Sequence, residues 1–307
     1  MKFSITIPAY KQRYLYEAIE SCLAQNYKDF ELIIVDDASP EDLKSVVDKF
    51  QDERIRYFRN EKNCGALNVV DNWNICLSYA KGDYVICMGD DDRLLPNCLD
   101  EYSKLLKKYP KIGLLHGWTE IIDENSNPTK LSCRRCEYES VYSLIWHRMN
   151  VYNYQFIGDF CFRKDILVKN GGFYKLPLAW SSDDLSAYIA ASENGVANTQ
   201  QIVFQYRVNS QTITSTGRAD IKMEATITFY HWISNFLKQK ASNHEDEMYR
   251  KQLLADFDKN FDSKKAYTIS QELKGKSVFR IFYWYKRRKQ WKLNGKIFLS
   301  AIKKAYF

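Results

Sequence analysis

The sequence of 307 residues has no run of 18 uncharged apolar residues, so no helix is expected to cross a membrane. Its first ten residues lack the long apolar core of a secretory signal peptide and instead resemble a strand that contains Pro8. Internal repeats and low-complexity segments are also missing. We therefore expect a folded cytoplasmic protein whose eight cysteines are reduced thiols.

The cysteines are scattered along the chain, apart from one closely spaced pair. Cys133 and Cys136 have the spacing of half a zinc site or of a redox pair. No second pair and no nearby histidine completes a metal site in the sequence. We interpret the two as loop cysteines, with a metal site as the alternative.

Acidic residues are missing from the C-terminal end of the chain. Residues 276–307 contain ten basic residues and no acid, a charge of +10, whereas the whole chain carries +7. The preceding 275 residues therefore sum to about −3. Because the basicity belongs to this tail, the rest of the chain is not expected to bind polyanions.

Alternating strands and helices are what the sequence does contain. Short apolar, β-rich runs predict buried strands at residues 3–7, 30–35, 55–59 and 84–88, and amphipathic helices separate them. This alternation with short connections predicts an α/β fold with a doubly wound, mostly parallel sheet. Further strands are expected at residues 112–118, 156–163 and 196–208, a polar loop at 123–139, and helices from residue 221 onward.

Clusters of aspartate lie at three strand or helix boundaries: Asp36 and Asp37, Asp90 to Asp92, and Asp183 and Asp184. In a doubly wound sheet, the carboxyl ends of the strands share one crevice, so the first two clusters are expected to meet there. Three adjacent carboxylates repel one another unless a cation lies among them. Hard oxygen ligands at a strand end suit Mg²⁺ or Mn²⁺ with a phosphorylated ligand, and the alternative for the triplet is a solvated turn.

Several segments together resemble, in order and spacing, an inverting family 2 glycosyltransferase with the GT-A fold. They are SITIPAY, SCLAQNYKDFELIIVDDAS, AKGDYVICMGDDDRLLP, GGFYKLPLAWSSDDLSAYIAASENG and VFQYRVNSQTITS, and the likeness covers about residues 3–215. The resemblance implies a GT-A nucleotide-sugar-binding and catalytic domain at residues 1–215, followed by a helical, basic extension at 216–307.

The reaction that the resemblance implies is transfer of a sugar from a nucleotide diphosphate, UDP by the family's common usage, to a hydroxyl acceptor. The acceptor is expected to be a glycan or lipid-linked glycan in surface polysaccharide or other glycan biosynthesis. A cation offsets the charge on the leaving diphosphate, and a carboxylate takes the proton of the attacking hydroxyl. The alternative is a nucleotide-sugar-binding protein without turnover.

The resemblance also implies roles for the residues that match the family's donor-binding motifs. Pro8, Ala9 and Tyr10 would line the nucleoside pocket, with Tyr10 packing on the base. Asp37 would accept a hydrogen bond from the base, and Asp90 would approach the ribose or the metal shell. Taken alone, Tyr10 is also explained as a strand-end aromatic and Asp37 as support for a turn.

The remaining acids match the metal-binding and catalytic positions of the family. Asp91 would be the principal ligand of Mn²⁺ or Mg²⁺, and Asp92 fills the last position of the acidic motif. Asp184 matches the general base in the family's Glu-Asp pair, in which Asp183 takes the first position and is the next candidate. The alternative for Asp184 is an acid favoured by the helix dipole.

Two positions depart from the family pattern. Gly89 replaces the usual first acid before the metal ligand, and Asn209 replaces a histidine that often touches diphosphate or metal. Both departures bear on the geometry of the metal and keep the binding-protein alternative open.

The basic tail combines its charge with aromatic residues at 279–285 and apolar residues spaced among lysines further on. Cationic amphipathic segments of this kind lie in the headgroup region of anionic membranes. We expect the tail to rest on the inner face of such a membrane, with packing of its aromatics on the rest of the chain as the alternative. Nucleic-acid binding is not expected, since no known module for it is visible.

Overall fold

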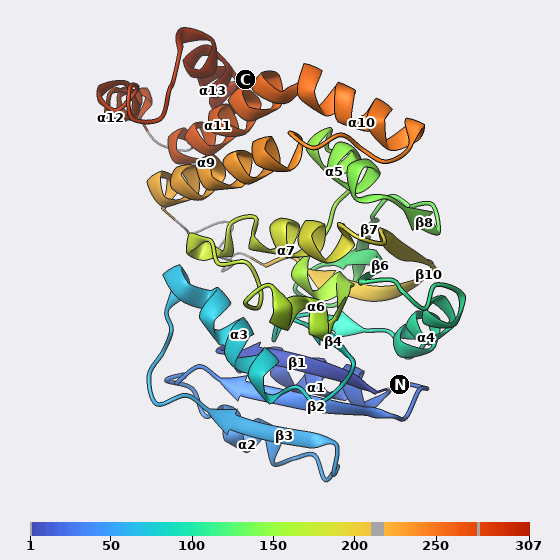
Figure 1. Ribbon diagram of the computed structural model, residues 1–307. Coiled ribbons are helices and arrows are strands. Elements are labelled where there is room, and N and C mark those ends of the chain that lie inside the picture. The colour runs from blue at the N-terminus through green and yellow to red at the C-terminus, as the bar shows by residue number, and fades with distance from the viewer. Residues whose placement is uncertain (1, 210–217, 275–276) are drawn as a thin grey trace. The chain divides into compact units, whose positions relative to one another are not determined.

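The structure is a computed structural model that describes residues 2–209, 218–274 and 277–307 (Figure 1). These residues form two compact units. The first contains residues 2–175 and 182–209, and the second contains residues 176–181 together with the described part of the chain from residue 218 onward.

The first unit is built on one sheet with the strand order β3-β2-β1-β4-β9-β6-β10-β5, in which β7 also pairs with β6 and β8 with β10. The strands are β1 (Phe3–Ala9), β2 (Phe30–Asp36), β3 (Ile55–Arg59), β4 (Tyr84–Cys87), β5 (Arg93–Leu94), β6 (Leu114–Ile122), β7 (Pro128–Leu131), β8 (Tyr138–Glu139), β9 (Phe160–Arg163) and β10 (Val196–Arg207). Strands β3, β2, β1 and β4 are parallel, as are β6 and β10, while short β9 runs antiparallel between β4 and β6. The predicted α/β fold is confirmed.

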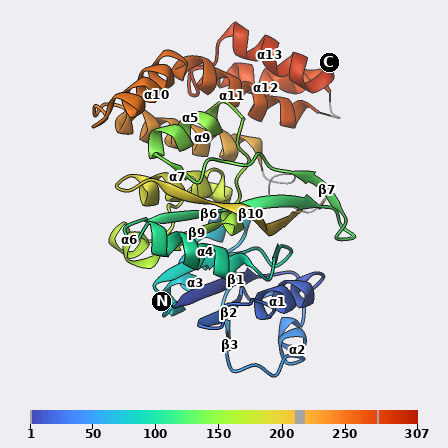
Figure 2. The ribbon, with the colours of Figure 1, turned by 90° about the vertical axis from the view of Figure 1, so that its right-hand side faces the viewer.

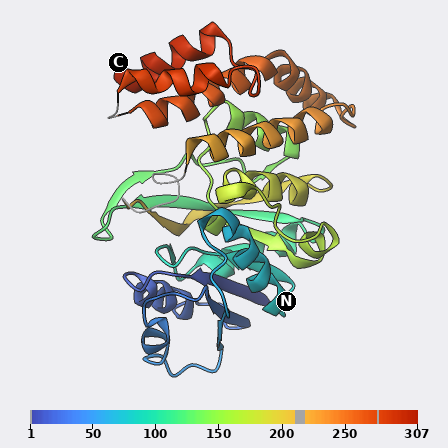
Figure 3. The ribbon, with the colours of Figure 1, turned by 90° about the vertical axis from the view of Figure 1, so that its left-hand side faces the viewer.

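Helices cover both faces of this sheet. They are α1 (Leu15–Leu23), α2 (Leu43–Val47), α3 (Val69–Tyr79), α4 (Cys98–Lys108), α5 (Val141–Met149), α6 (Lys164–Lys169) and α7 (Ser182–Ala191), with the 3₁₀ turns η1 (Ala66–Asn68) and η2 (Ile157–Asp159). Because successive strand residues point to opposite faces, β1 sends Phe3, Ile5 and Ile7 into a core shared with α1, α2 and α4. Figures 2 and 3 show α3, which buries Val70 and Trp73, on the other side of β1 and β2.

Two stretches differ from the sequence prediction. Residues 123–139, expected as a polar loop, contain β7 and β8, and Figure 2 shows the β6–β7 hairpin extending past one end of the sheet. The strand expected at 156–163 begins instead with η2 and only then enters β9. The turn is held by Asp159, whose Oδ2 accepts hydrogen bonds from Phe156 N (3.1 Å) and Thr119 Oγ1 (3.0 Å).

The second unit is helical, as the sequence predicts for the chain from residue 221 onward. It contains η3 (Pro177–Ala179), α9 (Ala219–Phe236), α10 (His244–Ala255), α11 (Phe257–Leu273), η4 (Val278–Arg280), α12 (Ile281–Lys286) and α13 (Gly295–Tyr306). Its core buries Trp284, Trp291 and Ile297 of the tail against Met223 of α9 and Ile269 of α11. Across the ranges that the structure describes, no helix is both long and apolar enough to span a membrane.

Candidate functional site

The acidic triplet follows β4 directly and lies beside the end of β1. The two strands are parallel neighbours, so their carboxyl ends fall at the same edge of the sheet. Asp90 joins the two strand ends, because its Oδ2 accepts hydrogen bonds from Tyr10 N and Lys11 N, both at 2.7 Å. Burial and the neighbouring Asp91 carboxylate outweigh these bonds and raise the pKa of Asp90 to about 6.

The other two acids of the triplet are held by the end of β10. Asn209 Nδ2 donates to Asp91 Oδ2 (2.6 Å), and Arg207 N donates to Asp92 Oδ1 (2.9 Å). Burial nevertheless raises the pKa of Asp91, and burial together with the Asp91 carboxylate raises the pKa of Asp92 well above its ordinary value. Burial thus disfavours the charged form of all three carboxylates of the triplet.

The glycine before the triplet leaves room for its carboxylates. A Cβ atom at Gly89 would lie 2.8 Å from Asp91 Oδ1 and 3.0 Å from Asp92 Oδ2. Oxygens of two different carboxylates therefore converge on one point beside the strand end. Where an acid would crowd these oxygens, the glycine keeps the space between them open.

Arg207 organises this edge of the sheet, although the sequence analysis did not single it out. Its side chain is fully buried and donates from Nε to Asp91 O (2.8 Å), from Nη1 to Ser126 Oγ (2.9 Å) and from Nη2 to Glu17 Oε2 (2.9 Å). Its guanidinium also lies 4.1 Å from the centroid of the Tyr14 ring. The one signal in the sequence was a charged residue at the end of an apolar strand.

The second acid cluster divides into two different environments. Asp37 N donates to Ala9 O (2.9 Å), which places Asp37 beside the end of β1. Its Oδ1 accepts from Asn60 Nδ2 (2.8 Å) and Cys64 N (3.0 Å). Tyr10, next to Ala9, keeps 43% of its surface exposed, so an aromatic ring and a carboxylate lie near the same strand ends.

Asp36, by contrast, is fully buried and bound within the sheet. It accepts hydrogen bonds from Tyr57 Oη (2.7 Å) and Ser39 N (2.8 Å) and forms an ion pair with Arg59. These contacts stabilise the β2–β3 pair and the turn after β2. Of the two adjacent acids, Asp36 has a structural role, and Asp37 lies closer to the strand-end edge.

The third cluster opens α7, and its two carboxylates differ. Asp184 is buried, and its Oδ1 accepts hydrogen bonds from Arg148 Nε (2.9 Å) and Gln155 Nε2 (2.6 Å). Asp183 is only partly buried. Burial and then the Asp184 carboxylate raise the pKa of Asp183 to about 7, although the Arg148 guanidinium opposes the shift.

Tyr206 of β10 connects the triplet with the third cluster. After burial, the carboxylates of Asp92, Asp91 and Asp183 are the causes that raise the pKa of its phenol. All three acids therefore lie within electrostatic reach of one side chain. The Tyr206 ring stacks on Phe156 with centroids 3.7 Å apart and planes 10° apart, which restricts the motion of the ring. Two predicted acid clusters thus face one region.

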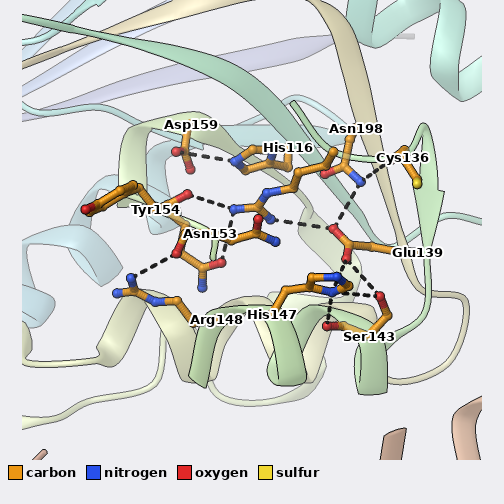
Figure 4. Close-up of polar contacts among 12 residues, drawn as sticks. His116, Cys136, Glu139, Ser143, His147, Arg148, Asn153, Tyr154, Asp159 and Asn198 are labelled. Carbon is orange, nitrogen blue, oxygen red and sulfur yellow. Dashed lines mark hydrogen bonds and ion pairs between the residues drawn. The ribbon is translucent and has the colours of Figure 1, made fainter. Parts of the chain in front are cut away.

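A buried polar network lies behind the third cluster (Figure 4). Arg135, between the paired cysteines, is buried and donates from Nη2 to Tyr154 O (2.8 Å) and Gln155 Oε1 (3.3 Å). Its Nη1 lies 3.7 Å from Glu139 Oε1. Cys133 and Cys136 themselves are free and exposed. In the described ranges, no group of three or more histidine, cysteine or acidic side chains could hold a metal ion.

Comparison with known proteins identifies the family. The family model described as "Glycosyl transferase family 2" matches residues 4–171. A Campylobacter jejuni protein named GalNAc(5)-diNAcBac-PP-undecaprenol beta-1,3-glucosyltransferase is 40% identical over 110 residues, which is 35% of this chain and 34% of that protein. The Escherichia coli protein WfgD, named UDP-Glc:alpha-D-GlcNAc-diphosphoundecaprenol beta-1,3-glucosyltransferase, is 34% identical over 125 residues, 40% of this chain and 47% of that protein.

The crystal structure of S. aureus TarS 1-349 in complex with UDP-GlcNAc has a similar fold. It is 16% identical, with a TM-score of 0.63, over 99% of this chain and 79% of that one. The chain matches less than half the length of these curated relatives. The family model, however, covers more than half of the chain itself. The chain, with its strand-end acids and GT-A-like sheet, belongs to glycosyl transferase family 2.

Proposed function

We propose that the chain is an inverting glycosyltransferase that moves a sugar from a UDP-sugar to a hydroxyl of a glycan or lipid-linked glycan. The observation that carries the proposal is the acid triplet at the end of β4, tied to the end of β1 and suited to a cation with diphosphate, together with the acid pair that opens α7 and is suited to accept a proton. The names of the C. jejuni and E. coli relatives, which specify undecaprenol-linked acceptors, support the acceptor class. The UDP-GlcNAc complex of TarS supports the donor class.

The nucleotide is held at the ends of β1 and β2. Pro8 and Ala9 form the floor, exposed Tyr10 packs on the base, and Asp37 accepts a hydrogen bond from it. Asp37 has a second carboxylate oxygen, Oδ2, whose contact with Cys64 N is 3.1 Å. Because each carboxylate oxygen can accept two hydrogen bonds, Oδ2 can accept one from the base while Oδ1 keeps its bonds to Asn60 and Cys64.

Mn²⁺ or Mg²⁺ fits the acidic triplet. Asp91 would be the principal ligand and Asp92 the second, since their oxygens converge beside Gly89 and a bound cation would favour the charged forms that burial disfavours. Mg²⁺ in nucleotide sites commonly takes one or two carboxylates together with substrate phosphates, so a set of three is not required. When bound, the cation offsets the negative charge of the leaving diphosphate. Asn209 positions Asp91, and Asp90 ties the triplet to β1.

Asp183 takes the proton from the acceptor hydroxyl, and Asp184 positions it. A general base works best with a pKa near the operating pH, and the pKa of Asp183 is about 7. The Asp184 carboxylate is bound by Arg148 and Gln155, which leaves it less available to a substrate. The sequence-based assignment of Asp184 as the base stays a prediction. Comparing the Asp183→Asn and Asp184→Asn proteins tests the two assignments against each other.

The reaction is a single displacement. As the O–H proton passes to the Asp183 carboxylate, the hydroxyl oxygen bonds to the anomeric carbon from the face opposite the diphosphate. The bond between that carbon and the diphosphate oxygen breaks, and the diphosphate leaves with the electron pair. One base on one face gives inversion, and no covalent enzyme intermediate is formed.

The C-terminal part of the chain places the enzyme on a membrane surface. In this proposal residues 1–215 are the catalytic domain and 216–307 the extension, which lies on the cytoplasmic face of an anionic membrane. Trp284 and Trp291 of the tail are buried in the helical core, whereas Phe279, Phe282 and Leu299 are 57–72% exposed among basic residues. The tail thus has one side packed in the helical core and one exposed side that is apolar and basic. The exposed side would bind the membrane that carries a lipid-linked acceptor.

The proposal is tested with purified protein, Mn²⁺ and a panel of nucleotide sugars. UDP release and sugar transfer with one donor class are the expected result, and calorimetry across UDP, GDP, dTDP and CDP identifies the nucleotide. Tight nucleotide binding without turnover on any donor or acceptor would favour the binding-protein alternative.

A further inference from the structure

Residues 152–155, between α5 and η2, form a strip in which exposed and buried side chains alternate. Tyr152 and Tyr154 are 56% and 37% exposed, while Asn153 and Gln155 between and after them are only 6% and 3% exposed. In an extended segment, successive side chains point to opposite sides, so their exposed fractions alternate when one side is buried. The strip therefore has a polar inner side and an aromatic outer side.

The inner side is fixed by hydrogen bonds to charged residues (Figure 4). Arg148 Nη1 donates to Asn153 O (3.3 Å), and Arg135 Nη2 donates to Tyr154 O (2.8 Å). Gln155 Nε2 donates to Asp184 Oδ1 (2.6 Å). Because Arg148 bonds to the same Asp184 oxygen, the strip is attached on two sides to the residue that adjoins Asp183.

The outer side presents aromatic faces supported by their neighbours. The Tyr152 ring stacks on Trp146 of α5, with centroids 5.6 Å apart and planes 29° apart. The Lys130 ammonium of β7 lies 4.4 Å from the centroid of the Tyr154 ring and 3.3 Å from its hydroxyl. Exposed aromatic surface on a fixed backbone marks a binding site more often than a lone exposed residue does.

We propose that Tyr152 and Tyr154 form a carbohydrate platform that binds the sugar of the acceptor by stacking on its apolar ring face. This inference rests on the proposed glycosyltransferase function and adds the residues that hold the acceptor. The strip is tied to the Asp183–Asp184 side of the site, where the hydroxyl loses its proton, whereas the donor residues come from the ends of β1, β2 and β4. An acceptor, not the donor, is the ligand that this position fits.

The first test measures transfer at saturating donor with methyl glycosides of glucose, galactose, N-acetylglucosamine and N-acetylgalactosamine as acceptors. Tyr152→Ala and Tyr154→Ala should each raise the acceptor KM about tenfold, in line with the loss of one aromatic contact. The kcat should change by less than about threefold and the UDP dissociation constant by less than about twofold. Tyr138→Ala is the matched control, since Tyr138 is 46% exposed and its ring stacks on Tyr109, outside the strip.

An unchanged acceptor KM in both variants, or an equal rise in the Tyr138→Ala control, would overturn the platform. A second measurement needs no turnover. Nitration of tyrosines by tetranitromethane, read by mass spectrometry, should be slowed at Tyr152 and Tyr154 by the same glycosides and unchanged at Tyr138. Protection of the two tyrosines without any sugar transfer would support the platform and reject the transferase function. Sugar transfer without protection would support the transferase function and reject the platform.

Discussion

The two adjacent acids of α7 give opposite predictions for stability and activity. In the Asp183→Asn protein, transfer should fall about 10²- to 10⁴-fold, the usual contribution of a general base. The same change should stabilise the fold at alkaline pH, because it removes a partly buried charge. In the Asp184→Asn protein, transfer should persist while stability falls.

The magnitude for Asp183 follows from its pKa. A carboxyl whose pKa is raised from 3.8 to about 7 favours the folded state fully below about pH 4, and this contribution is lost as the pH rises through 7. The shift corresponds to about 4 kcal/mol as an upper bound. Solvent screening of a partly exposed group reduces it, so we expect the Asp183→Asn protein to be more stable than the parent by about 1–2 kcal/mol at pH 8 and equal to it near pH 4.

The magnitude for Asp184 follows from its ion pair. Removing its charge leaves the Arg148 guanidinium, whose side chain is 25% exposed, without its carboxylate. Breaking a buried pair costs about 3–5 kcal/mol, and partial exposure puts this one near the lower end. Loss of the neighbouring negative charge should also lower the pKa of Asp183, so the acid limb of the kcat/KM profile should move to lower pH.

The assay combines urea unfolding at pH 4, 6 and 8 with the pH dependence of transfer for the parent and both variants. Calorimetric titration with UDP controls for loss of donor binding, which neither change should alter much. Near-normal transfer by the Asp183→Asn protein, together with a stable but inactive Asp184→Asn protein, would refute this assignment and restore Asp184 as the base.

Three further predictions concern the metal site and the tail. Asp91→Asn should weaken Mn²⁺-dependent UDP binding at least about tenfold in calorimetry, and equal affinity would remove Asp91 from the metal site. Because the pKa of Asp90 is about 6, its protonation below that pH removes a negative charge next to the metal ligands, so Mn²⁺ affinity measured by calorimetry should fall between pH 6.5 and 5 in the parent protein. Replacing Phe279 and Phe282 together by serine should reduce co-sedimentation with anionic liposomes and leave thermal stability unchanged, since both are exposed, and undiminished binding would contradict the membrane role.

Local patterns were sufficient to predict much of the fold. Short apolar runs in the sequence were enough to predict β1, β2 and β4. The position of the acids at the ends of these strands then followed from the parallel topology. The turn at η2 could not be read in the same way. It depends on Asp159 accepting from Thr119, 40 residues earlier, and no local periodicity reports such a contact.

In the candidate site, too, local sequence predicted some features, and contacts between distant residues determined others. The sequence predicted that acids gather at strand ends, but not which member of each pair forms an ion pair. Asp36 is paired with Arg59 and Asp184 with Arg148, partners 23 and 36 residues away. Since adjacent aspartates look alike in a sequence, only the distant arginine partners distinguish the ion-paired acid from its neighbour.

The contacts of Arg207 have a consequence for synthesis of the chain on the ribosome. Arg207 N bonds to Asp92, 115 residues earlier, and its side chain bonds to Glu17, 190 residues earlier. At about 5–20 residues per second, a nascent chain carries the acidic triplet for about 6–23 s before the arginine that holds it is made. The first strands can pair during that interval, but the triplet cannot reach its final geometry. Translation thus delays completion of the site until nearly all of the first unit has emerged.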